Sequence, residues 1–105
     1  MNSSNKGLLK FQLKERTALI TGSTRGIGWS IARGMAEAGA TVYINGRDKK
    51  ILDTRCKSLI DLGYNAKPAL FDATDVEATD KFLGSTATPI DILVNNAAIR
   101  LRKPI

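Results

Sequence analysis

One eight-residue segment limits the possible folds of this chain more than any other feature. It reads Thr-Gly-Ser-Thr-Arg-Gly-Ile-Gly and occupies residues 21–28. A short apolar run at residues 18–20 precedes it. Behind it, apolar residues recur at helical spacing, at Ile27, Ile31, Met35 and Ala38. The pattern predicts a strand, a tight glycine turn and then a helix whose N-terminus lies at the turn.

The glycines of this turn suit a phosphate-binding loop. A helix N-terminus offers unpaired N–H groups and a partial positive charge, which a pyrophosphate reaches only where side chains leave the backbone open. We assign Gly22 to the tight turn, Gly26 to the close approach and Gly28 to the packing of helix on strand. The spacing G-x-x-x-G-x-G differs from the common G-x-G-x-x-G, so the turn alone is also compatible with a flexible loop before a helix.

Composition indicates one globular domain in a reducing compartment. The chain has 105 residues, 43% of them hydrophobic and 25% charged. No apolar run approaches the roughly 20 residues of a membrane span, and residues 1–10 lack the apolar core of a secretory signal. Cys56 is the single cysteine and shares helical spacing with Leu52 and Leu59, so we expect a core residue. We therefore predict a cytoplasmic protein.

The absence of histidine removes Ser-His-Asp chemistry and most catalytic zinc sites, and we predict no metal site. The net charge of +6 belongs to the two ends of the chain, since residues 17–99 hold nine basic and nine acidic groups. This distribution argues against a nucleic-acid-binding face.

Short β-branched runs alternate with helical patterns along the chain. We predict further strands at residues 41–44, 67–71 and 90–94, and helices at 49–62 and 75–83. This order predicts an α/β fold with a doubly wound parallel sheet, strand order 3-2-1-4, and helices on both faces. Strands 1 and 4 are then neighbours, and a crevice opens at their carboxyl ends. The turn at 22–28 and the segment Asn95-Asn96-Ala97-Ala98 meet there.

With these motifs in place, the chain from Phe11 to Ile105 resembles the classical short-chain dehydrogenase/reductase family. The family motif T-G-x-x-x-G-x-G falls on residues 21–28, and N-N-A-G falls on 95–98, with Ala98 in place of glycine. The resemblance implies a Rossmann-type fold, with residues 1–10 as a tail and 11–105 as a partial dinucleotide-binding domain that ends after strand 4. It also implies that Asn95 steadies the sheet and that Asn96 approaches the cofactor ribose.

Residues 43–48 and 92–100 look most like the gluconate 5-dehydrogenase group, which resembles the acyl-carrier-protein ketoreductases. These enzymes interconvert an alcohol and a ketone with a nicotinamide cofactor. The resemblance also implies that Asp72, after the third strand, lies near the adenine. Its alternative role is to cap the third helix, although Asp75 fits that role better.

Charge favours NADP over NAD. Where NAD-using relatives carry an acid beside the adenosine ribose, this chain has Gly46, followed by Arg47. Arg25 in the glycine turn is a second guanidinium that can face a 2′-phosphate. Asp48 has nearly the spacing of a ribose-binding acid, but we prefer it as the N-cap of the following helix.

The predicted cofactor contacts come from the turn and from the ends of the later strands. They are Gly22, Ser23, Thr24, Arg25, Gly26, Ile27, Gly28, Asn45, Arg47, Asp72, Ala73, Asn96, Ala97 and Ala98. For Thr21, Ser23 and Thr24, local bonds to backbone donors are an equal alternative to phosphate contact. We expect Trp29 to pack rather than to stack on a base.

Classical members also use a Ser and a Tyr-x-x-x-Lys pair, which share one helix face. Tyr43 precedes Arg47 by four residues but lies in a predicted strand, and Tyr64 precedes Pro68. We therefore predict no catalytic residue here, and expect an NADP-binding portion of an oxidoreductase that is inactive alone. The alternative is a non-catalytic module that binds a nucleotide or a partner, or self-associates, through the open edge of strand 90–94.

Overall fold

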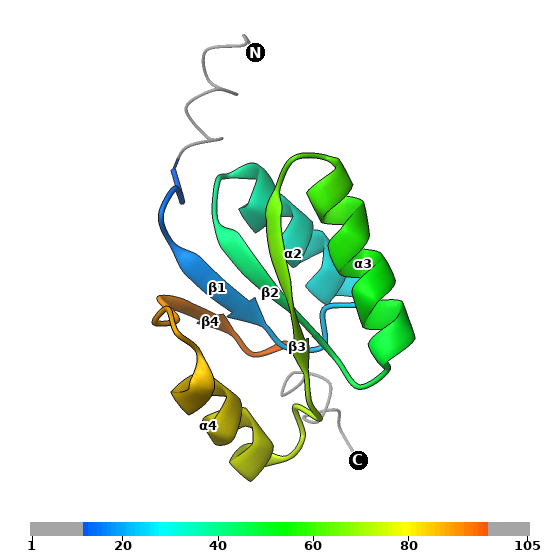
Figure 1. Cartoon of the computed structure of the whole chain (residues 1–105), viewed down its shortest axis with the longest axis vertical. Helices are drawn as coiled ribbons and strands as arrows, with labels where there is room; N and C mark the ends of the chain where they lie inside the picture. The colour runs from blue at the N-terminus through cyan, green and yellow to red at the C-terminus, as the bar shows by residue number, and fades with distance from the viewer. Residues whose placement is uncertain (1–11, 97–105) are drawn as a thin grey trace, which may run out of the picture.

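The structure is a computed structural model of the whole chain, and it describes residues 12–96. Three helices alternate with four strands in this part of the chain (Figure 1). They are β1 (Thr17–Ile20), α2 (Gly26–Glu37), β2 (Thr41–Gly46), α3 (Lys49–Asp61), β3 (Asn65–Leu70), α4 (Val76–Ser85) and β4 (Ile92–Val94). All strand pairs are parallel, and the sheet order is β3-β2-β1-β4. The predicted fold class and strand order are confirmed.

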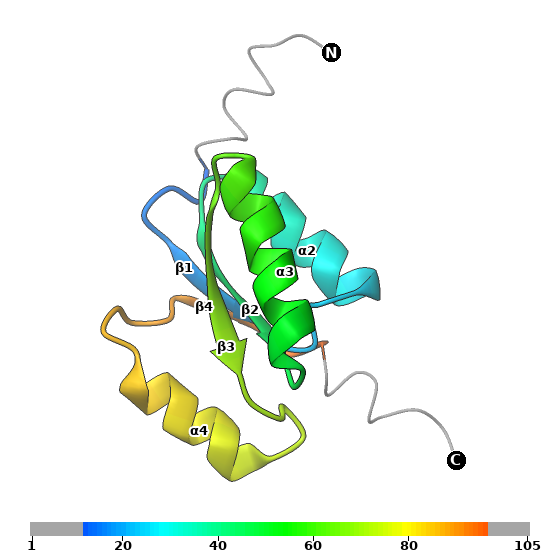
Figure 2. The same cartoon turned by 45° about the vertical axis from the view of Figure 1, so that its right-hand side comes forward.

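Helices cover both faces of the sheet. α2 and α3 lie side by side on one face, and α4 lies on the other (Figures 1 and 2). The main core lies between the sheet and the helices α2 and α3. It is formed by alternate residues of β1 and β2 together with small and branched side chains of the helices. Its strand residues include Ala18, Ile20, Val42 and Ile44, all 0% exposed.

The buried stripe of α2 consists of small residues. Gly28, Ala32 and Ala36 are buried at intervals of four, which places them on one helix face. Ile27, which we expected to begin the buried stripe, is instead 72% exposed. Small residues on the buried face let the helix backbone approach the sheet closely, and this brings the N-terminus of α2 down onto the glycine turn.

Two aspartates begin the later helices as predicted. Asp48 Oδ1 accepts from the backbone N–H groups of Lys50 (2.9 Å) and Ile51 (3.2 Å), so it is the N-cap of α3. Asp75 caps α4 by accepting from the N–H of Ala78 at 3.2 Å. Cys56 is buried in α3, which confirms it as a core residue.

Three strand boundaries differ from the prediction by two residues, and one of them is the end of β2, which runs to Gly46. β3 begins at Asn65, two residues early, because it pairs with β2 from Thr41 onward. β4 begins at Ile92, two residues late. The N–H of Thr17 donates to the Asp91 carboxylate at 2.8 Å, so a side chain replaces a ladder bond there.

The second face of the sheet is thinly covered. The Phe82 ring of α4 packs against Tyr43 and Phe71, with centroids 5.2 and 5.1 Å away, yet no residue of α4 is buried.

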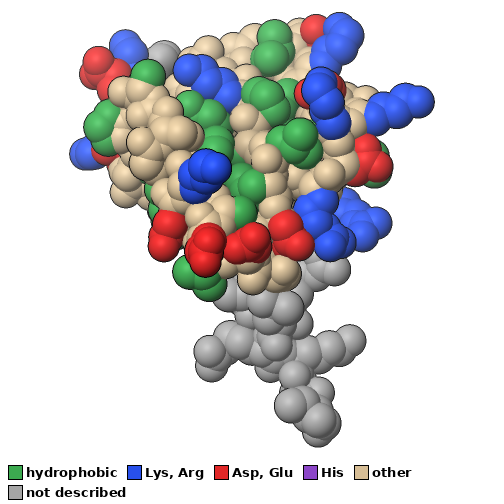
Figure 3. All heavy atoms as spheres, turned by 60° about the horizontal axis from the view of Figure 1, so that its bottom comes forward, with side chains coloured by type: hydrophobic (Ala, Val, Ile, Leu, Met, Phe, Trp, Pro, Cys, Tyr) green, Lys and Arg blue, Asp and Glu red, His purple; other side chains and the backbone are tan. Residues whose placement is uncertain are grey.

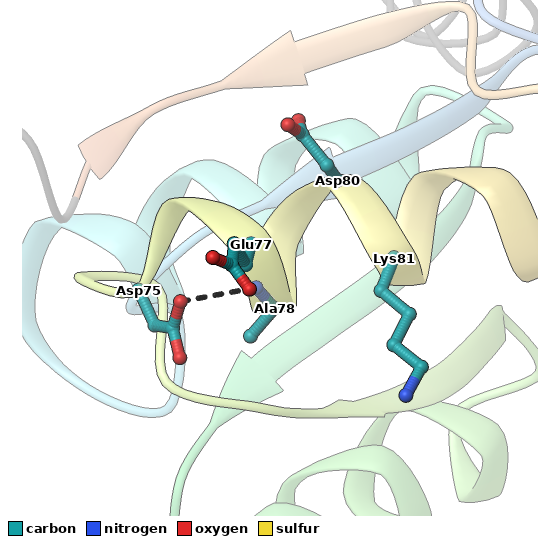
Figure 4. Close-up of a pocket in the computed structure, with 5 residues that line it drawn as sticks. All are labelled: Asp75, Glu77, Ala78, Asp80 and Lys81. Carbon is teal, nitrogen blue, oxygen red and sulfur yellow. Dashed lines mark hydrogen bonds between the residues drawn. The ribbon is translucent and has the colours of Figure 1, made fainter.

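An open depression of about 530 Å³ lies along the first turns of α4, lined by Asp75, Glu77, Ala78, Asp80 and Lys81 (Figure 4). On the face that Figure 3 shows, apolar side chains run across the middle and a row of acidic side chains lies below them. No helix within residues 12–96 is long and apolar enough to cross a membrane.

Candidate nucleotide-binding site

The glycine turn is tied to two other strand ends. Gly22 has φ +58°, a left-handed conformation that side chains disfavour. Its N–H donates to Asn45 Oδ1 at 2.8 Å, and its carbonyl accepts from Asn96 Nδ2 at 3.0 Å. Asn45 lies in β2 and Asn96 follows β4, so the turn is held from both neighbouring strands.

Ser23 and Asn45 form buried hydrogen bonds that support the turn. Ser23 Oγ donates to the Ile20 carbonyl at 2.6 Å and accepts from the Asn45 N–H at 2.8 Å. Asn45 Nδ2 donates to the carbonyls of Ala69 and Phe71, at 2.9 and 3.0 Å. Ser23 is 0% and Asn45 1% exposed. These bonds hold the turn in shape, and the cofactor contacts of Ser23 and Asn45 stay predictions.

Gly28 packs against the turn itself. A Cβ at this position would lie 2.4 Å from the Gly22 carbonyl oxygen, 2.8 Å from Asn96 Nδ2 and 3.0 Å from the Ser23 Cα. Such distances are below van der Waals contact. The third glycine of the motif therefore makes room for the Asn96–Gly22 hydrogen bond as well as for the close approach of helix and strand.

The N-terminus of α2 is open at Gly26. Gly26 has φ +63°, and a Cβ built there meets no described atom within 4 Å. Arg25 is the N-cap residue but its side chain makes no capping bond, and no acid lies in the first turn of this described helix. The first N–H groups of α2 thus keep their capacity to bind an anion, and a pyrophosphate fits these residues.

Arg47 and Asp72 meet where β2 and β3 end. The Arg47 guanidinium lies 3.9 Å from Asp72 Oδ2, and both side chains are exposed to solvent. The other oxygen, Oδ1, accepts from the Thr74 hydroxyl (2.7 Å) and N–H (2.9 Å). These bonds from Thr74, with a smaller contribution from Arg47, hold the pKa of the Asp72 carboxyl below its usual value. Asp72 therefore carries a negative charge beside the exposed Arg47 guanidinium. Ala73, the next residue, is half-buried.

The other predicted contacts surround the same strand ends. Arg25 and Ile27 are exposed and Thr24 is half-buried. Thr21 Oγ1 lies 3.3 Å from Asn95 Oδ1 and 3.4 Å from the Val94 carbonyl, which joins β1 to the end of β4. Ala97 and Ala98 lie outside the described residues. No group of acidic or cysteine side chains suited to a metal ion occurs within residues 12–96.

Sequence reasoning missed Arg55, in the second turn of α3. Its Nε donates to the Thr24 carbonyl at 2.6 Å, and its guanidinium carbon lies 4.8 Å from the centroid of the Trp29 ring. Trp29 packs at the border of the core, as expected. The side chain thus bridges α3, the glycine turn and the first turn of α2. No sequence motif predicts this contact, because Arg55 is 31 residues from Thr24 in sequence.

Comparisons with known proteins identify the wider group. A family profile described as short chain dehydrogenase matches residues 16–105. Gluconate 5-dehydrogenase of Gluconobacter oxydans (strain 621H) is 41% identical over 102 residues, covering 90% of this chain. The chain spans 38% of the length of that curated relative.

Two solved structures share the fold. A gluconate 5-dehydrogenase from Burkholderia cenocepacia J2315 in complex with NADP and tartrate has a TM-score of 0.72 and 45% identity, covering 86% of this chain and 36% of that one. A 3-oxoacyl-[acyl-carrier protein] reductase from Brucella melitensis with bound NAD has a TM-score of 0.79 and 35% identity, covering 91% and 36%.

Proposed function

The chain belongs to the short-chain dehydrogenase family, and we propose from that premise that it forms the NADP-binding portion of an alcohol/ketone oxidoreductase. The observation that carries the proposal is the open N-terminus of α2 at Gly26, held against the ends of β2 and β4 by Asn45 and Asn96. In open parallel sheets, ligands bind at the carboxyl ends of strands where the chain connections diverge. β1 and β4 are such a pair.

The residues divide into those that contact the cofactor and those that support them. The backbone around Gly26 and Ile27 would bind the pyrophosphate, since its N–H groups lie at the start of α2. Asn96, Ala97 and Ala98 would line the nicotinamide side, and Asp72 with Ala73 the adenine side. Gly22, Ser23, Asn45 and Gly28 would keep the turn in the shape that the backbone contacts need. When bound, NADP supplies the hydride acceptor or donor.

Two arginines support NADP over NAD. Arg47 follows Gly46, and Arg25 follows Thr24. The Thr24 methyl lies 2.7 Å from where a Cβ of Gly46 would be, so the two backbone segments adjoin. The backbones of Arg25 and Arg47 therefore lie close together, and both side chains are exposed. Two guanidiniums can bind a phosphate dianion through charge-assisted hydrogen bonds.

For the whole protein we propose a polyhydroxylated acid such as gluconate as the substrate class, by similarity to the two gluconate 5-dehydrogenases. The proposal also takes residues 11–105 as part of one dinucleotide-binding domain and places it in the cytoplasm. The buried free thiol of Cys56 is compatible with that compartment.

The test is a titration of the 105-residue chain with NADPH and with NADH, read from the fluorescence of Trp29. We expect saturable binding with NADPH preferred. The double variant R25A/R47A should lose about tenfold or more in NADPH affinity and little in NADH affinity, since each charge-assisted bond contributes about 1.5–3 kcal/mol. Arg33, exposed on α2 and paired with Glu37, provides the control R33A, which removes one surface charge outside the glycine turn. No saturable response to either nucleotide would refute the proposal.

A further inference from the structure

We propose that Arg55 is a positioning residue that fixes the Thr24–Arg25 peptide and thereby sets the preference of the site for a 2′-phosphate. This inference rests on the proposed function, because it concerns the same nucleotide site. Arg55 itself is placed outside the set of residues that would contact the cofactor.

Two contacts hold the Arg55 guanidinium in place. Its Nε donates to the Thr24 carbonyl at 2.6 Å, a short charge-assisted bond. Its planar head lies over the Trp29 ring at 4.8 Å, which is within the range of a cation–π contact. The side chain is half-buried, so solvent competes less for these contacts than it does at an open surface.

The bond to Thr24 orients the next residue. The peptide bond is planar and trans, so its C=O and N–H point in opposite directions. Because Arg55 draws the Thr24 carbonyl toward α3, the N–H of Arg25 points away from α3. Arg25 then adopts extended backbone angles, φ −160° and ψ 170°, before the helix begins. The direction in which the Arg25 side chain leaves the turn follows from this peptide.

Thr24 is also confined on its other side. Its methyl group sits over Gly46, at 2.7 Å from an added Cβ. The residue is thus enclosed between Arg55 of α3 and the end of β2. Loss of Arg55 leaves the peptide free to rotate, and a rotated peptide no longer presents Arg25 together with Arg47.

The test compares R55Q and R55K with K57Q. Lys57 lies on the same helix and pairs with Asp61, so K57Q removes one charge without touching the turn. Calorimetric titration of the 105-residue chain with NADPH and NADH gives the ratio of the two dissociation constants. We expect R55Q to reduce the preference for NADPH about tenfold while NADH affinity changes little, because an improperly placed Arg25 loses one charge-assisted bond. K57Q should keep the wild-type ratio.

R55K separates position from charge. Lysine keeps the positive charge but loses the planar head and the Nε donor. R55K should therefore show the reduced ratio, and a wild-type ratio in R55K would overturn the inference by showing that charge alone matters. Equal losses for both nucleotides in R55Q would overturn it too, since they would mean general damage to the fold.

A measurement without nucleotide keeps the two proposals separable. In R55Q, hydrogen exchange of a peptide covering residues 22–29 should be about threefold faster or more, while β1 at 17–20 and all of K57Q exchange as in the wild type. Unchanged exchange in the turn overturns the inference whether or not a nucleotide binds. If the wild-type chain binds neither nucleotide, the proposed function fails, and so does the role of Arg55 in selecting one.

Discussion

Asn96 donates from Nδ2 to the carbonyl oxygen of Gly22 over 3.0 Å, and so ties the end of β4 to the glycine turn that follows β1. The two residues are 74 positions apart in sequence. Gly28 makes this bond possible, because any side chain there would meet both partners.

Replacement of Gly28 by alanine tests this relationship. We expect G28A to lower the free energy of unfolding by about 1–3 kcal/mol, the usual cost of overpacking, and to weaken NADPH binding, because the new Cβ would lie 2.4 Å from the Gly22 oxygen. Gly34 is the matched control: it lies in the same helix, and an added Cβ there meets no described atom within 4 Å. G34A should stabilise the chain by about 0.5–1 kcal/mol. Urea unfolding measures both, and equal shifts would contradict the argument.

Asn45 should matter for stability more than an ordinary polar residue does. Asn45→Ala leaves the Gly22 N–H and the Ala69 carbonyl without their buried partner. We expect a loss of about 2–4 kcal/mol in urea unfolding, since each unsatisfied buried group costs about 1–3 kcal/mol. The control is Asn65→Ala at the exposed start of β3, with a change within about 0.5 kcal/mol. A loss below about 1 kcal/mol for N45A would show that water replaces the amide.

An acid at position 46 should reverse the nucleotide preference. Gly46→Asp places a carboxylate beside the proposed 2′-phosphate site and should lower the NADPH-to-NADH affinity ratio by about tenfold or more through charge repulsion. Because the new Cβ would meet the Thr24 methyl at 2.7 Å, the change is best made with Thr24→Ser, which removes that methyl. G46A/T24S controls for size. If the control lowers the ratio equally, charge is not the cause.

The buried thiol of Cys56 should lower the free energy of unfolding at alkaline pH. Desolvation, followed by the charge of Asp53, raises the pKa of Cys56 to about 11 from 9.0. The folded state thus favours the neutral thiol, so this stabilisation is complete below pH 9 and is lost as the pH rises toward 11. Between pH 8 and 11, the wild type should lose more unfolding free energy than C56A. Parallel pH profiles for the two proteins would rule out this contribution.

The local signals in the sequence predicted most of the fold. Alternating apolar runs and helical spacing placed all seven elements, and Asp48 and Asp75 were predicted as helix caps because an acidic residue before a helical pattern has one dominant local use. The strand order followed from the handedness of parallel crossovers. Ile27 was the exception: helical spacing identifies a stripe of apolar residues, but the close approach of α2 to the sheet selected the smaller residues Gly28, Ala32 and Ala36 for burial.

By itself, the sequence determined that a glycine turn at residues 21–28 joins a strand to a helix, because glycine spacing and hydrophobic period are local properties of the chain. Tertiary structure alone decided what holds that turn. Ser23 and Asn45 hold it through internal hydrogen bonds, and Arg55 reaches it from another helix. Those bonds join residues 22 to 31 positions apart. Which polar atoms are used within the protein and which stay open to a ligand depends on distances that no local pattern encodes.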